Sequence, residues 1–198
     1  MSGVVRKGNL LTFRLRHFRW MWLFSLALAV SLAGCAPLVI PNQPLNTTYA
    51  ILQPGTLLGQ TFVADHDGLS GVEIYLAPEI AGTGELILHL RSKPGAQDDL
   101  AVARLSAKTV DTPGMYRFTF APLGNTRRQY YYAFLEIQGE GRLQVGMAWG
   151  GASLDGAIYQ DHLPYNSQMA FSLVYDRGQA FIGVLRQGTS WFGMLLLG

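Results

Sequence analysis

The sequence has few of the residues that build disulfide frameworks and soft-metal sites. Its 198 residues contain one cysteine, Cys35, so no disulfide can form within the chain. The histidines that follow it, His66, His89 and His162, lie far apart and lack the spacing of metal ligands. We therefore expect a fold that is stable through packing alone and that holds no Cys/His metal cluster.

Motifs of common enzymes are also missing. There is no Gly-x-Ser-x-Gly nucleophile elbow, no His-Glu-x-x-His helix and no phosphate-binding loop. Asp98 and Asp99 are adjacent acids, but they follow Pro94-Gly95, which favours a solvated turn over a catalytic pair of carboxylates. The sequence thus predicts a protein that is not an enzyme and has no cofactor.

The positive charge of the whole chain comes from its N-terminal segment. The formal net charge is +2, but five of the 15 basic residues precede Cys35, leaving ten against 13 acidic residues. The part that begins at Cys35 therefore carries a net charge of −3 and contains no run rich in lysine or arginine. A nucleic-acid partner is not expected, because such partners require a basic surface.

The first 34 residues have the organisation of a secretory signal peptide. Arg6, Lys7, Arg14, Arg16 and Arg19 form a basic region without acids. A 12-residue, largely apolar run over 21–32 and two small residues follow. This run is shorter than the ~20 residues that a membrane-spanning helix needs.

The residues Leu32-Ala33-Gly34-Cys35 then resemble the lipobox of bacterial lipoproteins, with the matching context extending back to Arg6. The resemblance implies cleavage before Cys35, a diacylglyceryl group on its thiol and acylation of the new amine, palmitate included. It also implies an extracytoplasmic protein of the bacterial cell envelope, anchored to a membrane. An uncleaved membrane helix and a secreted protein with a free thiol are the alternatives.

Residues 35–55 are predicted to be an extended tether. They include Pro37, Pro41, Pro44 and Pro54, and proline favours extended backbone. Such a tether would separate the domain that follows from the membrane surface.

Residues 56–176 alternate apolar and polar side chains with a period of two, in about eight or nine short segments separated by turns. In 69–76, for example, Val72, Ile74 and Leu76 fall on one face and Glu73 and Tyr75 on the other. Regular short strands without helical periodicity predict an all-β fold, an antiparallel β-sandwich. The strand at 129–138 is apolar on both faces, as expected for a central strand.

Several of these segments also resemble bacterial jelly-roll modules of the galactose-binding-like, carbohydrate-binding type. The similar segments are Gly59-Gln60-Thr61-Phe62, Gly68-Leu69-Ser70-Gly71-Val72, Leu86-Ile87-Leu88-His89-Leu90, Tyr116-Arg117-Phe118-Thr119-Phe120 and Met169-Ala170-Phe171-Ser172-Leu173. They consist mostly of core positions, so the resemblance implies a jelly-roll fold more than a particular ligand. Related modules often hold a structural calcium ion, for which Asp65 and Asp67 are the weak candidates; a plain turn at 65–68 is the competing interpretation.

The stretch 149–165 is the candidate ligand-binding site. Trp149, Tyr159 and Tyr165 offer flat aromatic faces, and Asp161 offers a carboxylate, in a segment rich in glycine. Aromatic faces beside hydrogen-bonding groups suit sugar rings. The alternative is that these aromatic residues cap one end of the core.

Residues 177–198 form a hydrophobic tail that carries two charged side chains, Arg177 and Arg186. It is consistent with an element covering the sandwich, an interfacial segment such as a short helix, or the start of a membrane helix. The function predicted first is a lipid-anchored, non-catalytic module that binds glycan or cell-envelope polysaccharide. The alternative is a structural or assembly lipoprotein whose sandwich and tail dock a membrane protein partner.

Overall fold

The computed structural model describes residues 37–41, 48–80, 82–148, 156–161, 163–165 and 167–180. These residues form thirteen strands, a 3-10 helix η1 (Ala107–Thr109) and one helical turn at 177–180. The strands are β1 (Leu38–Pro41), β2 (Tyr49–Leu52), β3 (Leu58–Val63), β4 (Leu69–Ile80), β5 (Glu85–Arg91), β6 (Ala101–Ser106), β7 (Gly114–Leu123), β8 (Tyr130–Gln138), β9 (Arg142–Ala148), β10 (Ile158–Gln160), β11 (Leu163–Tyr165), β12 (Gln168–Met169) and β13 (Phe171–Tyr175).

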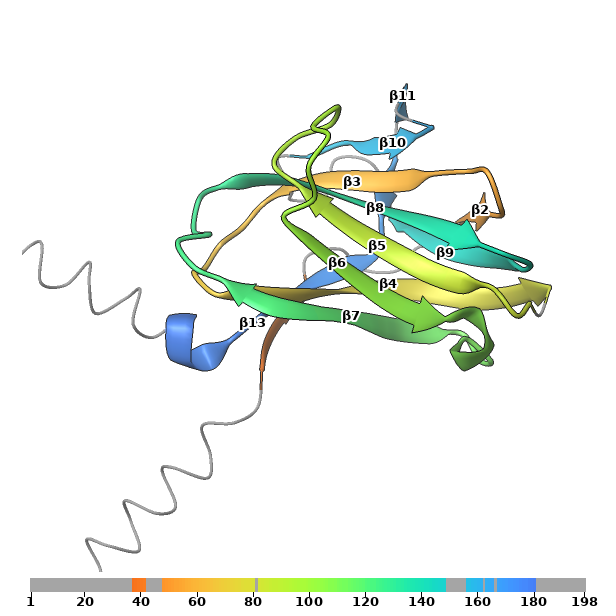
Figure 1. Ribbon diagram of the computed structural model, residues 1–198, viewed down its shortest axis with the longest axis horizontal. Coiled ribbons are helices and arrows are strands. Elements are labelled where there is room, and N and C mark those ends of the chain that lie inside the picture. Colours follow the sequence, from red (N-terminus) through yellow and green to blue (C-terminus); the bar gives the residue numbers. More distant parts are fainter. Residues whose placement is uncertain are drawn as a thin grey trace, which may run out of the picture. The chain divides into compact units, whose positions relative to one another are not determined.

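The strands form two antiparallel sheets that pack face to face (Figure 1). The seven-stranded sheet has the order β1-β13-β4-β9-β12, with β2 paired to β9 and β7 paired to β4. The six-stranded sheet has the order β11-β10-β3-β8-β5-β6. The predicted antiparallel β-sandwich is therefore confirmed.

The core lies between the sheets and follows the predicted alternation. Val72, Ile74 and Leu76 of β4 are at most 1% exposed, and Leu86, Leu88 and Leu90 of β5 fill the core from the opposite sheet. In β6, Ala103 is buried while Val102 and Arg104 face solvent. Side chains that alternate along a strand point to opposite faces, so a period of two places one set in the core.

The central strand β8 is buried on both faces, as its sequence predicts. Every residue from 131 to 135 is buried. Tyr131, Ala133 and Leu135 point into the core cluster, whereas Tyr132 and Phe134 lie on the outer face of the six-stranded sheet. The outer face of this sheet thus has an aromatic centre as well as a polar rim.

The region predicted to be a tether contains two strands of the seven-stranded sheet. Leu38 to Pro41 pair with β13, and Tyr49 to Leu52 pair with β9. The sandwich therefore begins at Leu38 rather than at residue 56, and the tether prediction is wrong for these eight positions. Proline is tolerated at the end of an edge strand, which is where Pro41 lies, so the proline content was a misleading signal.

The strand number is also larger than the eight or nine predicted. Strands of two to four residues, such as β1, β2 and β10 to β12, contain too few alternations to be recognised by period alone. The signal-peptide segment 1–34, Cys35 and residues 181–198 of the tail lie outside the described residues. Within the described part of the chain, no helix is long and apolar enough to cross a membrane.

Candidate functional site

The hairpin formed by β10 and β11 holds the described part of the predicted binding stretch. Tyr159 lies in β10, and Tyr165 pairs with Ile158 at the end of β11, whereas Trp149 lies outside the described residues. Asp161 occupies the turn with a φ of 50°. Its carboxylate accepts a hydrogen bond from the Leu57 amide (2.9 Å), and its own amide donates to the Leu57 carbonyl (2.9 Å). Asp161 therefore attaches the hairpin to the start of β3.

Tyr159 belongs to a row of residues that crosses the outer face of the six-stranded sheet. The strand register places Tyr159 opposite Gly59, Gly59 opposite Phe134, and Phe134 opposite His89. Neighbouring strands lie ~4.8 Å apart, so these residues are side by side on one face. The fold thus brings Tyr159 into line with residues of β3, β8 and β5.

The aromatic rings along this row are in contact, and we call Tyr159, Tyr132, Phe134 and His89 the aromatic row. The Tyr159 ring meets the edge of Tyr132 (centroids 5.5 Å apart, 76° between planes), and Tyr132 lies 5.5 Å from Phe134. Phe134 in turn stacks on His89 (4.6 Å, 5°). These separations are typical of favourable aromatic pairs.

Gly59 makes room for this arrangement. A Cβ atom at this position would come within 2.5 Å of the Tyr132 ring. Because Gly59 has no side chain, the Tyr132 ring can lie across β3. The Tyr132 side chain is 1% exposed in this position. Any larger residue would force the ring away from Tyr159 or Phe134.

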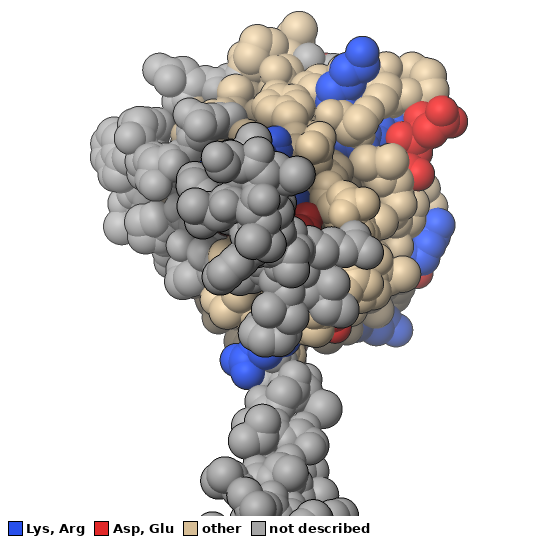
Figure 2. All heavy atoms as spheres, turned by 90° about the vertical axis from the view of Figure 1, so that its left-hand side faces the viewer, with Lys and Arg blue, Asp and Glu red and all other residues tan. Residues whose placement is uncertain are grey.

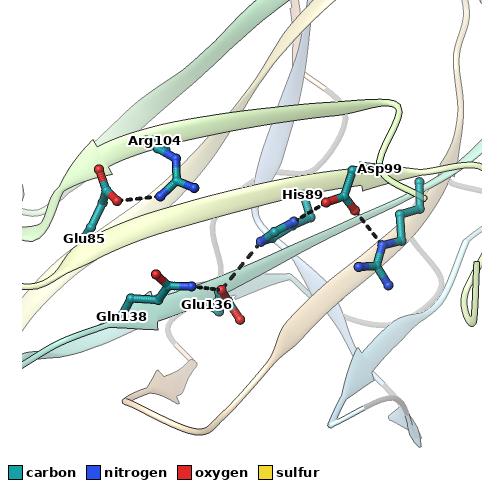
Figure 3. A network of polar contacts seen from close by, with 7 residues as sticks. Glu85, His89, Asp99, Arg104, Glu136 and Gln138 are labelled. Carbon is teal, nitrogen blue, oxygen red and sulfur yellow. Dashed lines mark hydrogen bonds and ion pairs between the residues drawn. The ribbon is translucent and has the colours of Figure 1, made fainter. Parts of the chain in front are cut away.

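Charged side chains surround the His89 end of the row (Figure 3). His89 Nδ1 is 2.7 Å from Asp99 Oδ2, and Arg91 Nε donates to Asp99 Oδ1 at 2.6 Å. The Arg91 guanidinium also lies 4.7 Å from the centre of the Phe134 ring, a cation–π contact. On the other side of the imidazole, His89 Nε2 is 3.6 Å from Glu136 Oε1, which accepts a hydrogen bond from Gln138 at 2.8 Å.

The ionised form of Asp99 is favoured by its partners. Its partial burial acts to raise the pKa, but the hydrogen bonds and positive charges of Arg91 and His89 together outweigh burial, so the pKa of Asp99 is lowered. At Tyr132 burial dominates and raises the pKa of the phenol to about 12. The buried phenol of Tyr132 is therefore neutral at neutral pH, and the carboxylate of Asp99 is ionised.

Two polar atoms of the row are buried without a hydrogen-bond partner among the described residues. They are the Tyr132 hydroxyl and His89 Nε2, whose 3.6 Å separation from Glu136 is longer than a hydrogen bond. Buried polar atoms in folded proteins almost always have a partner. These two atoms are therefore the positions in the aromatic row at which one more hydrogen-bond partner, such as a buried water molecule, would be stabilising.

The charged side chains around His89 are reachable from solvent. The exposed fractions are 16% for His89, 19% for Arg91, 24% for Asp99 and 26% for Glu136, and Tyr159 is half-buried. The site therefore combines fixed donors and acceptors with one partly open aromatic ring. This combination suits a polyhydroxylated ligand.

The turn that contains Asp65 and Asp67 has a structural role in the described chain. Asp67 Oδ1 accepts from the Arg127 amide (3.0 Å), and the Asp65 amide donates to the Tyr175 hydroxyl (2.9 Å). No group of three or more histidine, cysteine, aspartate or glutamate residues that could hold a metal ion occurs in the described ranges. The predicted turn is present, with Gly68 at a φ of 81°.

Sequence reasoning missed most of this site. Alternation in β5 does place His89 and Arg91 on the outer face, and Asp99 lies in an exposed loop, but its ion pairs with His89 and Arg91 are not evident from the sequence. Its role depends on the loop after β5 folding back, where Arg91 donates to the Ala96 carbonyl and the Leu100 amide donates to the Leu90 carbonyl. The hydrophilic composition of that loop gives no sign of this conformation.

No known family model matches the chain. A comparison with curated proteins finds no match either. Function is therefore inferred from the residues and their geometry.

Proposed function

We propose that the protein is a lipid-anchored, extracytoplasmic binding module without catalytic activity, and that it binds a glycan or cell-envelope polysaccharide. The binding site is the aromatic row together with Arg91, Asp99 and Glu136. The observation that carries the proposal is the partly exposed cluster of His89, Arg91, Asp99 and Glu136 at one end of the aromatic row. In this row Tyr132 Oη and His89 Nε2 are buried without a hydrogen-bond partner among the described residues.

Sugar recognition requires the kinds of group that this face offers. Sugar hydroxyls both donate and accept, so they pair well with a carboxylate next to a guanidinium, and their apolar ring faces pack on aromatic rings. Asp99 and Glu136 supply acceptors, Arg91 supplies donors and Tyr159 supplies a half-buried ring. The sandwich fold is compatible with the galactose-binding-like jelly roll that the sequence resembles.

Membrane attachment is the second part of the proposal. It rests on the lipobox-like Leu32-Ala33-Gly34-Cys35 and on the basic and apolar segments before it. Two or three acyl chains on Cys35 give firm anchoring, because each buried methylene contributes ~0.8 kcal/mol. The absence of any other cysteine leaves Cys35 free for this role.

The test is binding to immobilised cell-envelope polysaccharides and to a glycan array. Tyr159→Ala is expected to weaken binding at least ~10-fold, equivalent to ~1.4 kcal/mol. Tyr49→Ala is the matched control, because Tyr49 is a 43% exposed tyrosine on the other sheet. Absence of binding to every glycan, or equal effects of the two substitutions, would contradict the proposal.

A second candidate function is docking of a membrane protein partner. It is favoured by an exposed apolar row on the outer face of the seven-stranded sheet. Met115 lies opposite Tyr75, whose ring is 6.4 Å from that of Tyr49, and Met115 and Tyr49 are each 43% exposed. Apolar and aromatic side chains of this kind are common at protein interfaces. Photo-crosslinking from position 115 in cells would yield a single stoichiometric partner on this account, and dispersed products would exclude it.

A further inference from the structure

The chain between Cys35 and the first strand is very short. Leu38 is the first residue of β1, so three peptide links separate it from Cys35. Consecutive Cα atoms are 3.8 Å apart, which limits the Cα separation of Cys35 and Leu38 to ~11 Å. A lipid on Cys35 would therefore hold β1 close to the membrane surface, in place of the long tether that proline content indicates.

The C-terminal tail begins at the same end of the sandwich. Leu38 pairs with Tyr175, the last residue of β13. Asp176 follows and caps the helical turn at 177–180, accepting a hydrogen bond from the Gln179 amide at 2.9 Å. We call this region, with the loops 64–68 and 124–129, the anchor end; it lies at the left of Figure 1.

Hydrogen bonds join the loops of the anchor end to one another. The Thr126 hydroxyl, with Thr126 0% exposed, donates to the His66 carbonyl (2.7 Å) and accepts from the Leu69 amide (3.3 Å). Gly68 donates to the Leu123 carbonyl (3.1 Å) and accepts from the Asp176 amide (2.8 Å). These bonds join the β3–β4 loop, the β7–β8 loop and the end of β13. Because β1 pairs with β13, the orientation of β1 fixes the orientation of the whole sandwich.

The chemistry of the anchor end suits contact with lipid headgroups. Arg128 is exposed, and Tyr130, which pairs with Val63 at the end of β3, is 43% exposed. Tyrosine and arginine both pair an apolar body with a polar tip, which is favourable at a membrane interface. Acidic and basic side chains are mixed on the described part of this face (Figure 2), so the acyl anchor rather than net charge would set the contact.

We propose that the anchor end lies against the bilayer surface and that the long axis of β4 points away from it. This inference rests on the lipid anchor of the proposed function. β4 rises over 12 residues from Leu69 to Ile80, which spans ~36 Å. The turn between β4 and β5 is therefore the part of the sandwich held farthest from the membrane, and the glycan-binding face stands roughly perpendicular to it.

Depth measurement by fluorescence quenching tests this orientation. The acylated protein is extracted from membranes and reconstituted into neutral phosphatidylcholine vesicles with nitroxide-labelled headgroups. Ala121→Cys and Thr83→Cys supply probe sites, because both positions are exposed and Cys35 is the only natural cysteine. Ala121 is two residues from the end of β7 that pairs with Leu69, and Thr83 lies in the β4–β5 turn.

Quenching is expected to be at least ~2-fold stronger at Ala121→Cys, because the two sites differ in height by nearly the length of β4. Insertion of about ten Gly/Ser residues between Ala36 and Pro37 lengthens the link between Cys35 and β1 by ~17 Å. This insertion should remove most of the difference in quenching between the two probe sites. Equal quenching in the natural chain, or stronger quenching at Thr83→Cys, overturns the orientation while leaving the anchor intact. Protein that fails to float with the vesicles overturns the lipid anchor and the orientation together.

Discussion

Asp99 connects the two basic side chains at the His89 end of the aromatic row. It binds Arg91 through one oxygen and His89 through the other. A carboxylate held in this way fixes the positions of both side chains, so a ligand would meet donors that are already oriented. This preorganisation reduces the entropy lost when a flexible side chain is ordered on binding.

The lowered pKa of Asp99 predicts a specific dependence of stability on pH. Its ordinary pKa is 3.8, and the folded-state pKa is lower, so its contribution to folding is complete above 3.8 and is lost as pH falls through the folded-state value. Asp99→Asn should therefore lower the free energy of unfolding at neutral pH and flatten its decline below pH 3.8. Denaturant unfolding at a series of pH values measures both effects.

Asp98→Asn is the matched control, because Asp98 is the exposed neighbour of Asp99 in the same loop. We expect the unfolding free energy of this variant to follow the natural protein across the acid range. If the two variants show the same pH profile, the hydrogen bonds of Asp99 contribute nothing to stability.

Gly59 is the second residue on which the aromatic row depends. In Gly59→Ala the new Cβ would lie 2.5 Å from the Tyr132 ring, so the ring must move. Forcing a buried side chain out of place typically costs ~1–3 kcal/mol, and near-ultraviolet circular dichroism should report the altered tyrosine environment. Gly114→Ala is the control, since a Cβ there meets nothing within 4 Å. Equal stability of the two variants would show that the row tolerates a side chain at position 59.

At the level of secondary-structure elements, the β10–β11 hairpin carries Tyr159 to the edge of the six-stranded sheet. It is attached through β10 to β3 and through both hydrogen bonds between Asp161 and Leu57. The hairpin is short, so the loss of one connection has a large effect on its local stability.

Asp161→Ala removes the side-chain acceptor for the Leu57 amide. A hydrogen bond of this kind typically contributes ~1 kcal/mol to stability. We expect faster amide hydrogen exchange in residues 158–160 and weaker glycan binding, with the global unfolding free energy nearly unchanged. Gln160→Ala, at an exposed neighbouring position, should leave exchange as it is in the natural protein. Unchanged exchange in Asp161→Ala would show that strand pairing alone holds the hairpin.

The inward faces of the long strands could be predicted from sequence, and the assembly of the site could not. Alternation in β4, β5 and β8 reports which side chains face the core, because the signal is repeated several times within each strand. Strand β1 offers four residues and β12 two, which is too few for any periodic signal. Their assignment requires the partner strands, and pairing partners are not visible in a single sequence.

The same limit applies to the candidate site. Tyr159 was recognised because it lies in a loop-rich aromatic stretch, and Asp161 because it is a nearby acid. Asp161 proved to hold the hairpin in place, and Tyr159 contacts residues of β8 that are distant in sequence. Only the register of β10, β3, β8 and β5 brings the aromatic row together.

For the whole molecule, the lipobox-like segment and the sandwich form one account. On the proposed function, a domain of two packed sheets, with a net charge of −3 counted from Cys35, would be exported, acylated and held close to the membrane by the three peptide links between Cys35 and Leu38. In the proposed orientation the two outer faces would meet other components of the envelope, one through the aromatic row and the other through Tyr49, Tyr75 and Met115. Whether glycan binding is the function depends on which face engages a ligand.

Chemical-shift mapping answers that question most directly. The measurement uses the isotope-labelled chain from residue 35 onward, with Cys35→Ser to keep it unacylated, titrated with fragments of cell-envelope polysaccharide. If the aromatic row binds glycan, the Gly59, His89 and Tyr159 amides are expected to show saturable shifts that are lost in Asp99→Asn. An absence of shifts at saturating fragment, or shifts confined to Tyr49, Tyr75 and Met115, would contradict it.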